Sequence, residues 1–371
     1  MPANLLSLND DILLLVVSYL SQPEALRFSL TAKEVYPIAI RQMPTIAGCQ
    51  NAQHLTKIHA YMLSDIPNRA HRLVDLAIAH HRVESPATAI LVKDLLAEAV
   101  NLRKLLLEPF TSLLNLEPRV GDALAALQRL QYIWLIEIWN EHCLSTFPRM
   151  RSNPSRVQLT ENHNWGYSTF FSCLASFTNL RTLRFADVVE FSSESEPEPS
   201  GSWTKVPQVQ CLILSDCVVP WSNFVDSLPN VRSVEIKEVT PAIEIGRKFW
   251  PDLRRLMLHE STDFRIVEAV CPVHWLVISV PLDEYDEDEK PDGEWELEPL
   301  NAVRAASPMV FCFTVSCSVD TAFLEHLIET GLQRLTLVDV NFLPDDDPDD
   351  PDGMEWLATN LSFLDLVPVT G

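Results

Sequence analysis

The chain has 371 residues, of which 47% are hydrophobic and 8% aromatic, enough for a large core and for more than one folding unit. Its formal net charge is −23, yet most of that charge lies in three acidic stretches, residues 190–198, 283–298 and 345–355. The remainder is nearly neutral, which argues against nucleic acid as a partner, since phosphate binding requires clustered Lys and Arg side chains. The most apolar N-terminal run, Ile12 to Val17, is too short for a secretory signal or a membrane span. We therefore expect a soluble intracellular protein, cytoplasmic or nuclear, with no membrane partner.

The first forty residues predict three short helices. The apolar residues of the first helix recur at helical spacing, and Asn9 or Asp10 is placed to cap its first turn. Those residues are Leu8, Ile12, Leu13, Val16, Val17 and Leu20. Pro23 suits the first turn of a second helix, which is expected to bury the residues Leu26, Phe28 and Leu30. A third segment carries the apolar residues Val35, Tyr36, Ile38 and Ile40.

The first helix carries more apolar residues than one buried face needs. With Leu14 and Leu15 it is apolar almost all the way round, and such a helix must be covered on every side. Three short helices cannot cover every face from within. Either the rest of the chain or a second protein must cover it.

These residues resemble the F-box, whose pattern begins Leu-Pro-x-Glu-Ile-Leu, continues through Ile and Tyr-Leu, and ends in a Val/Ser-Lys-x-x-Trp-like segment. The matching residues are Leu8, Asn9, Asp11, Ile12, Leu13, Val16, Tyr19, Leu20, Leu26, Lys33 and Tyr36. The chain departs from the pattern at Asn9 (usually Pro), Asp11 (usually Glu) and Tyr36 (usually Trp). The resemblance covers about residues 5–43 and is nearest to the divergent F-box families of fungi.

The resemblance implies that residues 1–43 form a three-helix module that binds a Skp-family adaptor of an SCF-type, cullin–RING ubiquitin ligase. The adaptor-binding residues that it implies are Leu8, Ile12, Leu13, Leu15, Val16, Leu20, Pro23 and Leu26. The alternative is a small helical cap that only shields the end of a repeat domain, which solenoids require.

Residues 44–371 contain a seven-residue pattern, x-L-x-x-L-x-L with conservative replacements, in twelve copies spaced 20 to 35 residues apart. The copies begin at Arg72, Asn101, Arg129, Asn153, Asn179, Gln208, Asn230, Asp252, Pro272, Ser307, Gly331 and Asn360. Helical patterns such as Val92–Val100 and Thr169–Phe177 lie between them. A short strand plus a helix cannot bury its apolar face alone and must stack on its neighbours. This spacing predicts an α/β leucine-rich-repeat solenoid of short parallel strands and helices.

Alternation along each strand divides its residues between the core and a concave, solvent-facing sheet surface. Aromatic, Arg and Met side chains on that surface match the composition of protein–protein hot spots. The expected target-binding residues are Tyr132, Trp134, Arg156, Arg184, Arg255, Met257 and Trp275. The alternative for each of them is a contact with the neighbouring strand and no partner.

An acidic residue follows the strand core in seven copies of the pattern. These residues are Glu137, Glu161, Asp187, Asp216, Glu238, Glu260 and Asp339. Such a row could steer a basic partner, or it could satisfy backbone N–H groups where each strand ends. We favour the second interpretation.

Three acidic inserts, residues 192–202, 283–298 and 345–353, interrupt the repeats and predict solvated loops.

The eight cysteines have neither CxxC nor zinc-ligand spacing, so we expect most of them to be small buried residues. The sequence contains no Gly-rich phosphate loop, GxSxG or HExxH motif. We therefore expect no catalytic site, no metal and no cofactor.

The resemblance to the F-box implies a substrate-recognition subunit of an SCF-type ubiquitin ligase, with an unidentified protein as its target. The alternative is a leucine-rich-repeat scaffold for protein–protein interaction without a ligase.

Overall fold

The computed structural model describes residues 9–20, 22–31, 33, 35–36, 45–79, 85–138, 141–162, 167–188, 204–219, 221–241, 250–259, 273–281, 303–315 and 337–342. The three acidic inserts and the last copy of the repeat pattern lie outside these residues. The chain divides into two compact units, residues 1–138 with 142–154 and residues 139–141 with 155–371. The predicted domain boundary lies at residue 43. The division between the two compact units lies further along the chain, within the predicted repeat domain of residues 44–371.

Two helices open the first unit, α1 (Asp10–Ser18) and α2 (Gln22–Ser29). Asn9 caps α1, as predicted: its side-chain Oδ1 accepts a hydrogen bond from the Ile12 backbone N–H at 3.0 Å. The helices pack around a small core of Val17, Ala25 and Val35, with Leu20 and Phe28 against it. The third predicted helix lies mostly outside the described residues.

The prediction that Leu30 is buried is wrong. Its side chain is 74% exposed, because α2 ends at Ser29 and Leu30 lies in the turn that follows. The helical pattern continued past the point where the helix stops.

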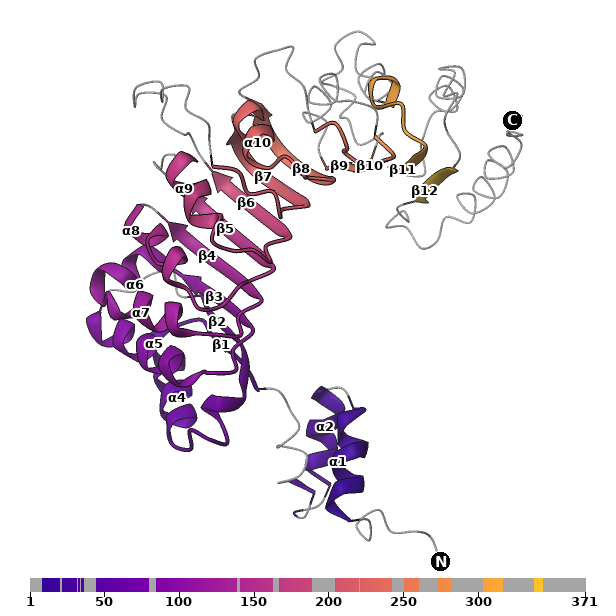
Figure 1. The fold of residues 1–371 in the computed structure, drawn as a ribbon. Helices are drawn as coiled ribbons and strands as arrows, with labels where there is room; N and C mark the ends of the chain where they lie inside the picture. The colour runs from indigo at the N-terminus through magenta and orange to yellow at the C-terminus, as the bar shows by residue number, and fades with distance from the viewer. Residues whose placement is uncertain are drawn as a thin grey trace, which may run out of the picture. The chain divides into compact units, whose positions relative to one another are not determined.

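The sheet of the first unit has four parallel strands in chain order: β1 (Thr45–Cys49), β2 (Leu73–Ala79), β3 (Lys104–Glu108) and β4 (Tyr132–Ile138). Helices connect the strands and lie on one side of them (Figure 1). The helices and 3-10 turns are α4 (Ala52–Leu63), η2 (Ala70–Arg72), α5 (Pro86–Glu98), α6 (Phe110–Leu116), α7 (Arg119–Ala126), α8 (Glu141–Leu144) and η3 (Phe147–Arg149). Strand β1 was not predicted, since its sequence TIAGC has one large apolar residue where the pattern requires three.

The second unit continues the same strand–helix alternation. Its strands are parallel and lie in chain order: β5 (Arg156–Asn162), β6 (Thr182–Val188), β7 (Cys211–Val219), β8 (Ser233–Pro241), β9 (Arg255–Leu258), β10 (Trp275–Pro281), β11 (Val310–Val315) and β12 (Leu337–Phe342). Helices α9 (Tyr167–Leu174) and α10 (Trp221–Ser227) belong to this unit, and residues 303–306 are also helical. The first eleven copies of the predicted pattern overlap β2 to β12 in order, which confirms a solenoid-like α/β fold.

Aromatic side chains fill the core of the second unit between the helices and the strands. Phe170 and Phe171 of α9, Phe185 of β6 and Phe224 of α10 meet edge to face, with ring centroids 5.2–5.6 Å apart. Each is at most 2% exposed. Edge-to-face rings add about 0.5–1.5 kcal/mol per pair to the burial of their area.

The acidic row marks a backbone irregularity. Glu137, Asp187, Asp216 and Glu238 have φ between 50° and 60°, in the left-handed region. β7 and β8 continue for three residues past Asp216 and Glu238, whereas Glu137 and Asp187 are the penultimate residues of β4 and β6. The pairing of β7 with β6 and β8 passes over Asp216, and it passes over Asp187 and Glu238 at the same step, so the register of the three strands is unchanged.

We expect Glu137→Gly to raise the free energy of unfolding by roughly 1 kcal/mol. A left-handed non-glycine residue costs about 1–2 kcal/mol, while a glycine costs about 0.4–1 kcal/mol through the unfolded chain. Denaturant unfolding measures the change. Glu137→Ala is the matched control, because it removes the carboxylate and keeps the backbone penalty. An equal gain for both variants would show that charge, and not backbone conformation, is responsible.

Candidate protein-interaction sites

Helix α1 has one buried edge and one exposed apolar edge. Leu13 and Val17 are only 3% and 2% exposed. Ile12, Leu15 and Tyr19, at spacings of three and four residues that place them on one helix face, are 44%, 53% and 82% exposed. We call these three residues the α1 apolar edge. Two further large apolar side chains of the N-terminal segment are exposed, Leu30 and Tyr36.

The eight predicted adaptor-binding residues separate into groups. Ile12 and Leu15 are exposed, Val16 and Leu20 are half-buried, and Leu13 is buried. The side chains of Leu8, Pro23 and Leu26 lie outside the described residues. Leu13 therefore packs in the interior. Tyr19 lies on the exposed edge, although it was not among the predicted contact residues.

The face of the second unit's sheet that the helices do not cover carries two rows of in-register side chains. The first row passes from Arg156 through Thr182, Cys211 and Ser233 to Arg255 and Trp275. The second passes from Gln158 through Arg184, Ile213 and Glu235 to Met257 and Val277. We call this surface the open sheet face. All five predicted target-binding residues of the second unit lie on it, exposed or half-buried.

Polar and aromatic contacts join neighbouring strands on the open sheet face. His259 Nε2 lies 3.2 Å from Glu235 Oε1, and the Arg255 guanidinium lies 5.3 Å from the centre of the Trp275 ring. Trp275 remains 41% exposed although its Nε1 also donates to Cys312 Sγ at 3.2 Å. Trp275 therefore contacts the neighbouring strands and still exposes enough of its ring to contact a partner.

Glu235 is the acidic centre of a basic surface. The hydrogen bond from His259 lowers the pKa of Glu235, and the nearby charges of Arg184 and Arg255 lower it further. The Arg184 Nε is buried and has no hydrogen-bond partner among the described residues. One carboxylate among several arginines leaves positive charge available to an acidic partner.

The first unit has a smaller open surface of the same kind. Tyr132 is in register with Lys104, and Trp134 with Leu106, and both aromatic side chains are half-buried. The sequence interpretation placed both correctly on the uncovered side. It chose neither Glu235 nor His259, because their importance depends on a pairing between β8 and β9 that neither strand shows alone.

The cysteines are mostly interior residues, as predicted. Of the six that are described, five are buried and Cys211 is half-buried. Burial raises the pKa of Cys49 to about 11 and that of Cys217 to about 12, so both remain thiols at neutral pH. The described residues contain no group of three or more side chains able to hold a metal ion.

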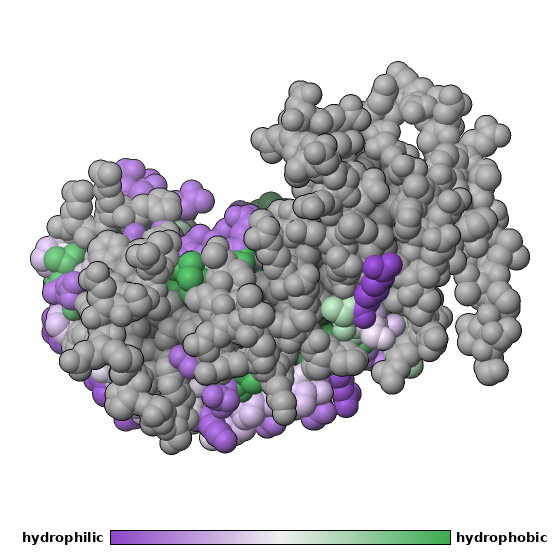
Figure 2. Space-filling model, turned by 90° about the horizontal axis from the view of Figure 1, so that it is seen from above, coloured by the Kyte–Doolittle hydropathy of each residue, from purple (hydrophilic) through white to green (hydrophobic). Residues whose placement is uncertain are grey.

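No protein-family model matches this sequence, and no curated protein is significantly similar to it. Within the described part of the chain, every helix is too short or too polar to cross a bilayer. Figure 2 shows a mostly hydrophilic surface where the described residues are visible, with scattered hydrophobic side chains.

Proposed function

We propose that this protein is a substrate-recognition subunit of an SCF-type, cullin–RING ubiquitin ligase. Its N-terminal helices bind a Skp-family adaptor, and its open sheet face binds the target protein. The observation that carries the proposal is the α1 apolar edge, Ile12, Leu15 and Tyr19, on a helix whose other edge is buried.

Large apolar side chains exposed together on a short helix favour a partner that buries them. Burying an exposed Leu or Ile side chain contributes about 1.5–3 kcal/mol each, and a few such residues dominate most interfaces. The segment also resembles the F-box, whose partner is a Skp-family adaptor. The strand–helix repeat, with its spacing of 20 to 35 residues, resembles leucine-rich repeats. A receptor of this kind performs no covalent chemistry and acts by raising the local concentration of its target.

Capture of a purified Skp-family adaptor by the full chain tests the first half of the proposal. We expect a stable complex on size-exclusion chromatography. Failure to form it would favour the alternative, a repeat scaffold for protein–protein interaction in which the helices are only a cap.

The second half predicts that the open sheet face selects the target. We expect Arg255→Glu and Trp275→Ala each to weaken target capture by about 30-fold, equivalent to about 2 kcal/mol, while adaptor capture remains. Quantitative affinity purification of the full chain measures both in one experiment. Arg151→Ala, an exposed arginine of the first unit, is the control. Unchanged capture by both face variants would exclude this surface as the target site.

A further inference from the structure

Three acidic residues occupy the same step of three neighbouring strands in the second unit. Asp187 of β6, Asp216 of β7 and Glu238 of β8 have φ between 50° and 52°. The pairing of β6 with β7 passes over Asp187 and Asp216 together, and the pairing of β7 with β8 passes over Asp216 and Glu238 together. Because adjacent strands are about 4.8 Å apart, this shared step brings the three carboxyl groups into one short row.

Asp216, in the middle of this row, is joined to Glu238. Asp216 is half-buried, whereas Asp187 and Glu238 are exposed. A hydrogen bond connects the side chains of Asp216 and Glu238 across β7 and β8. An ionised carboxylate only accepts hydrogen bonds, while a protonated one can donate. The bond between these two carboxyl groups therefore requires that one of them carries a proton.

The surroundings of the pair favour that proton on Asp216. Among the described residues, the charged or titratable groups around Asp216 are Asp187, Cys217, Lys237 and Glu238. Burial raises the pKa of Asp216, and so do the hydrogen bond to Glu238 and the negative charges of Glu238 and Asp187. The same hydrogen bond lowers the pKa of Glu238, helped by Lys237, whose Nζ lies 3.4 Å from Glu238 Oε1. Asp216 is thus the donor, and Glu238 is the carboxylate that accepts.

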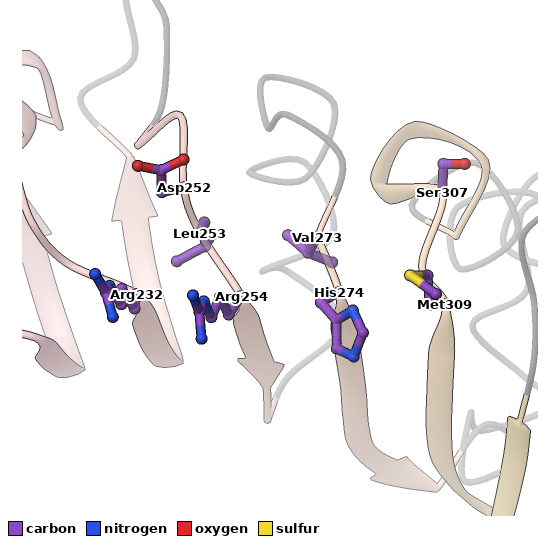
Figure 3. Close-up of a pocket in the computed structure, with 8 residues that line it drawn as sticks. All are labelled: Arg232, Asp252, Leu253, Arg254, Val273, His274, Ser307 and Met309. Carbon is purple, nitrogen blue, oxygen red and sulfur yellow. The ribbon is translucent and has the colours of Figure 1, made fainter.

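The arginines that precede β8 and β9 lie too far from the pair to neutralise it. Arg232 and Arg254 are at the starts of these strands, where both line a pocket of about 370 Å³ (Figure 3). Six residues of extended chain from Arg232 to Glu238 span about 20 Å. The screening length at physiological ionic strength is about 8 Å. The charge of these arginines is therefore largely screened at the acidic row.

We propose that Asp216 and Glu238 share one proton, and that this proton makes the pairing between the ends of β7 and β8 sensitive to pH. Beyond the pair, Cys217–Val219 remains paired with Val239–Pro241. While the proton is present, the carboxyl hydrogen bond ties the two strands together. Once the proton is lost to solvent, two like charges face each other across the strands and destabilise the ends beyond them. This property belongs to the fold of the second unit and does not depend on which partner the chain binds.

Stability of the second unit is expected to fall as pH rises above the usual carboxyl range. There the unfolded chain has released its carboxyl protons, while the folded pair still holds one because the pKa of Asp216 is raised. The stability that Asp216 contributes is therefore lost as pH rises through its folded pKa. Glu238 acts in the opposite sense, because its pKa is lowered. Its contribution is present above the usual range and is lost only as pH falls through its folded pKa.

Denaturant unfolding of the full chain between about pH 5 and about pH 8 tests the shared proton. We expect the unfolding midpoint of the second unit to fall as pH rises. Asp216→Asn should abolish that fall and raise the midpoint at the alkaline end, because its amide donates to Glu238 without titrating. Asparagine also adopts the left-handed conformation more readily than most residues do, so the variant should keep the fold.

Asp187→Asn is the matched control, since Asp187 has the same backbone conformation one strand away. It removes a charge from the row but leaves the shared proton, so the fall in midpoint should remain. Hydrogen exchange of the strand ends beyond Asp216 and Glu238, corrected for the intrinsic pH dependence, gives a local measurement. Protection should decrease with pH in the unaltered chain and stay constant in Asp216→Asn.

Two outcomes would overturn the proposal. One is a pair of parallel pH profiles for the unaltered chain and Asp216→Asn. The other is equal loss of the pH dependence in Asp187→Asn, which would assign the effect to general repulsion along the row.

Discussion

Leu15→Asp is expected to weaken adaptor capture by about 30-fold or more while the chain stays folded. Because Leu15 is 53% exposed, a carboxylate there remains hydrated in the free protein and costs little folding free energy. In the complex the same carboxylate would be desolvated in an apolar interface, which costs about 2 kcal/mol or more. Surface-bound adaptor titrated with the full chain measures the affinity, and circular dichroism checks the fold.

Two control variants separate an interface from a cap. Ile90→Asp introduces the same charge at a 38%-exposed apolar position of α5 and should leave adaptor capture unchanged. Leu13→Asp places the charge at a 3%-exposed position and should disrupt the helices themselves. If Leu15→Asp binds the adaptor as well as the unaltered chain does, the α1 apolar edge is not the interface.

The contrast between Leu13 and Leu15 also shows what the sequence could not predict at this site. Helix α1 was predictable because its signals are local, namely the Asn9 cap and the apolar spacing. Which leucine is buried depends on where α2 and Val35 pack, and an all-round apolar helix gives no periodicity that ranks one face above another. The sequence therefore located helix α1, but it named Leu13 as a surface contact, and the structure buries that side chain.

The sheet was predictable for a similar reason, because each strand carries its own three-point apolar pattern and a period of two assigns its faces. That period fails just before the left-handed residues, where two buried residues follow one another, as Phe185 and Ala186 do on β6 before Asp187. The Glu235–His259 pair was not predicted, because it joins side chains of neighbouring strands twenty-four residues apart in the sequence.

Phe224→Ala is the variant with the largest expected effect on stability. The Phe224 ring is fully buried and meets Phe171 and Phe185 edge to face, with centroids 5.5 and 5.6 Å away. Removing it leaves a cavity between α10, α9 and β6, for which we expect a loss of about 3–5 kcal/mol. This is a large share of the about 5–15 kcal/mol that stabilises an ordinary domain. Denaturant unfolding followed by tryptophan fluorescence measures it, and Phe224→Leu, which retains most of the volume, should cost less than about 1.5 kcal/mol.

The same variant tests whether the two interaction sites fold independently. The helices α1 and α2 have their own core in Val17, Ala25 and Val35, and none of its residues belongs to the second unit. At a denaturant concentration that unfolds the second unit of Phe224→Ala only, adaptor capture should therefore persist while target capture is lost. Loss of both together would show that the helices depend on the repeats for stability, as a cap does. Persistence of adaptor capture without the second unit would support the proposed function over a helical cap.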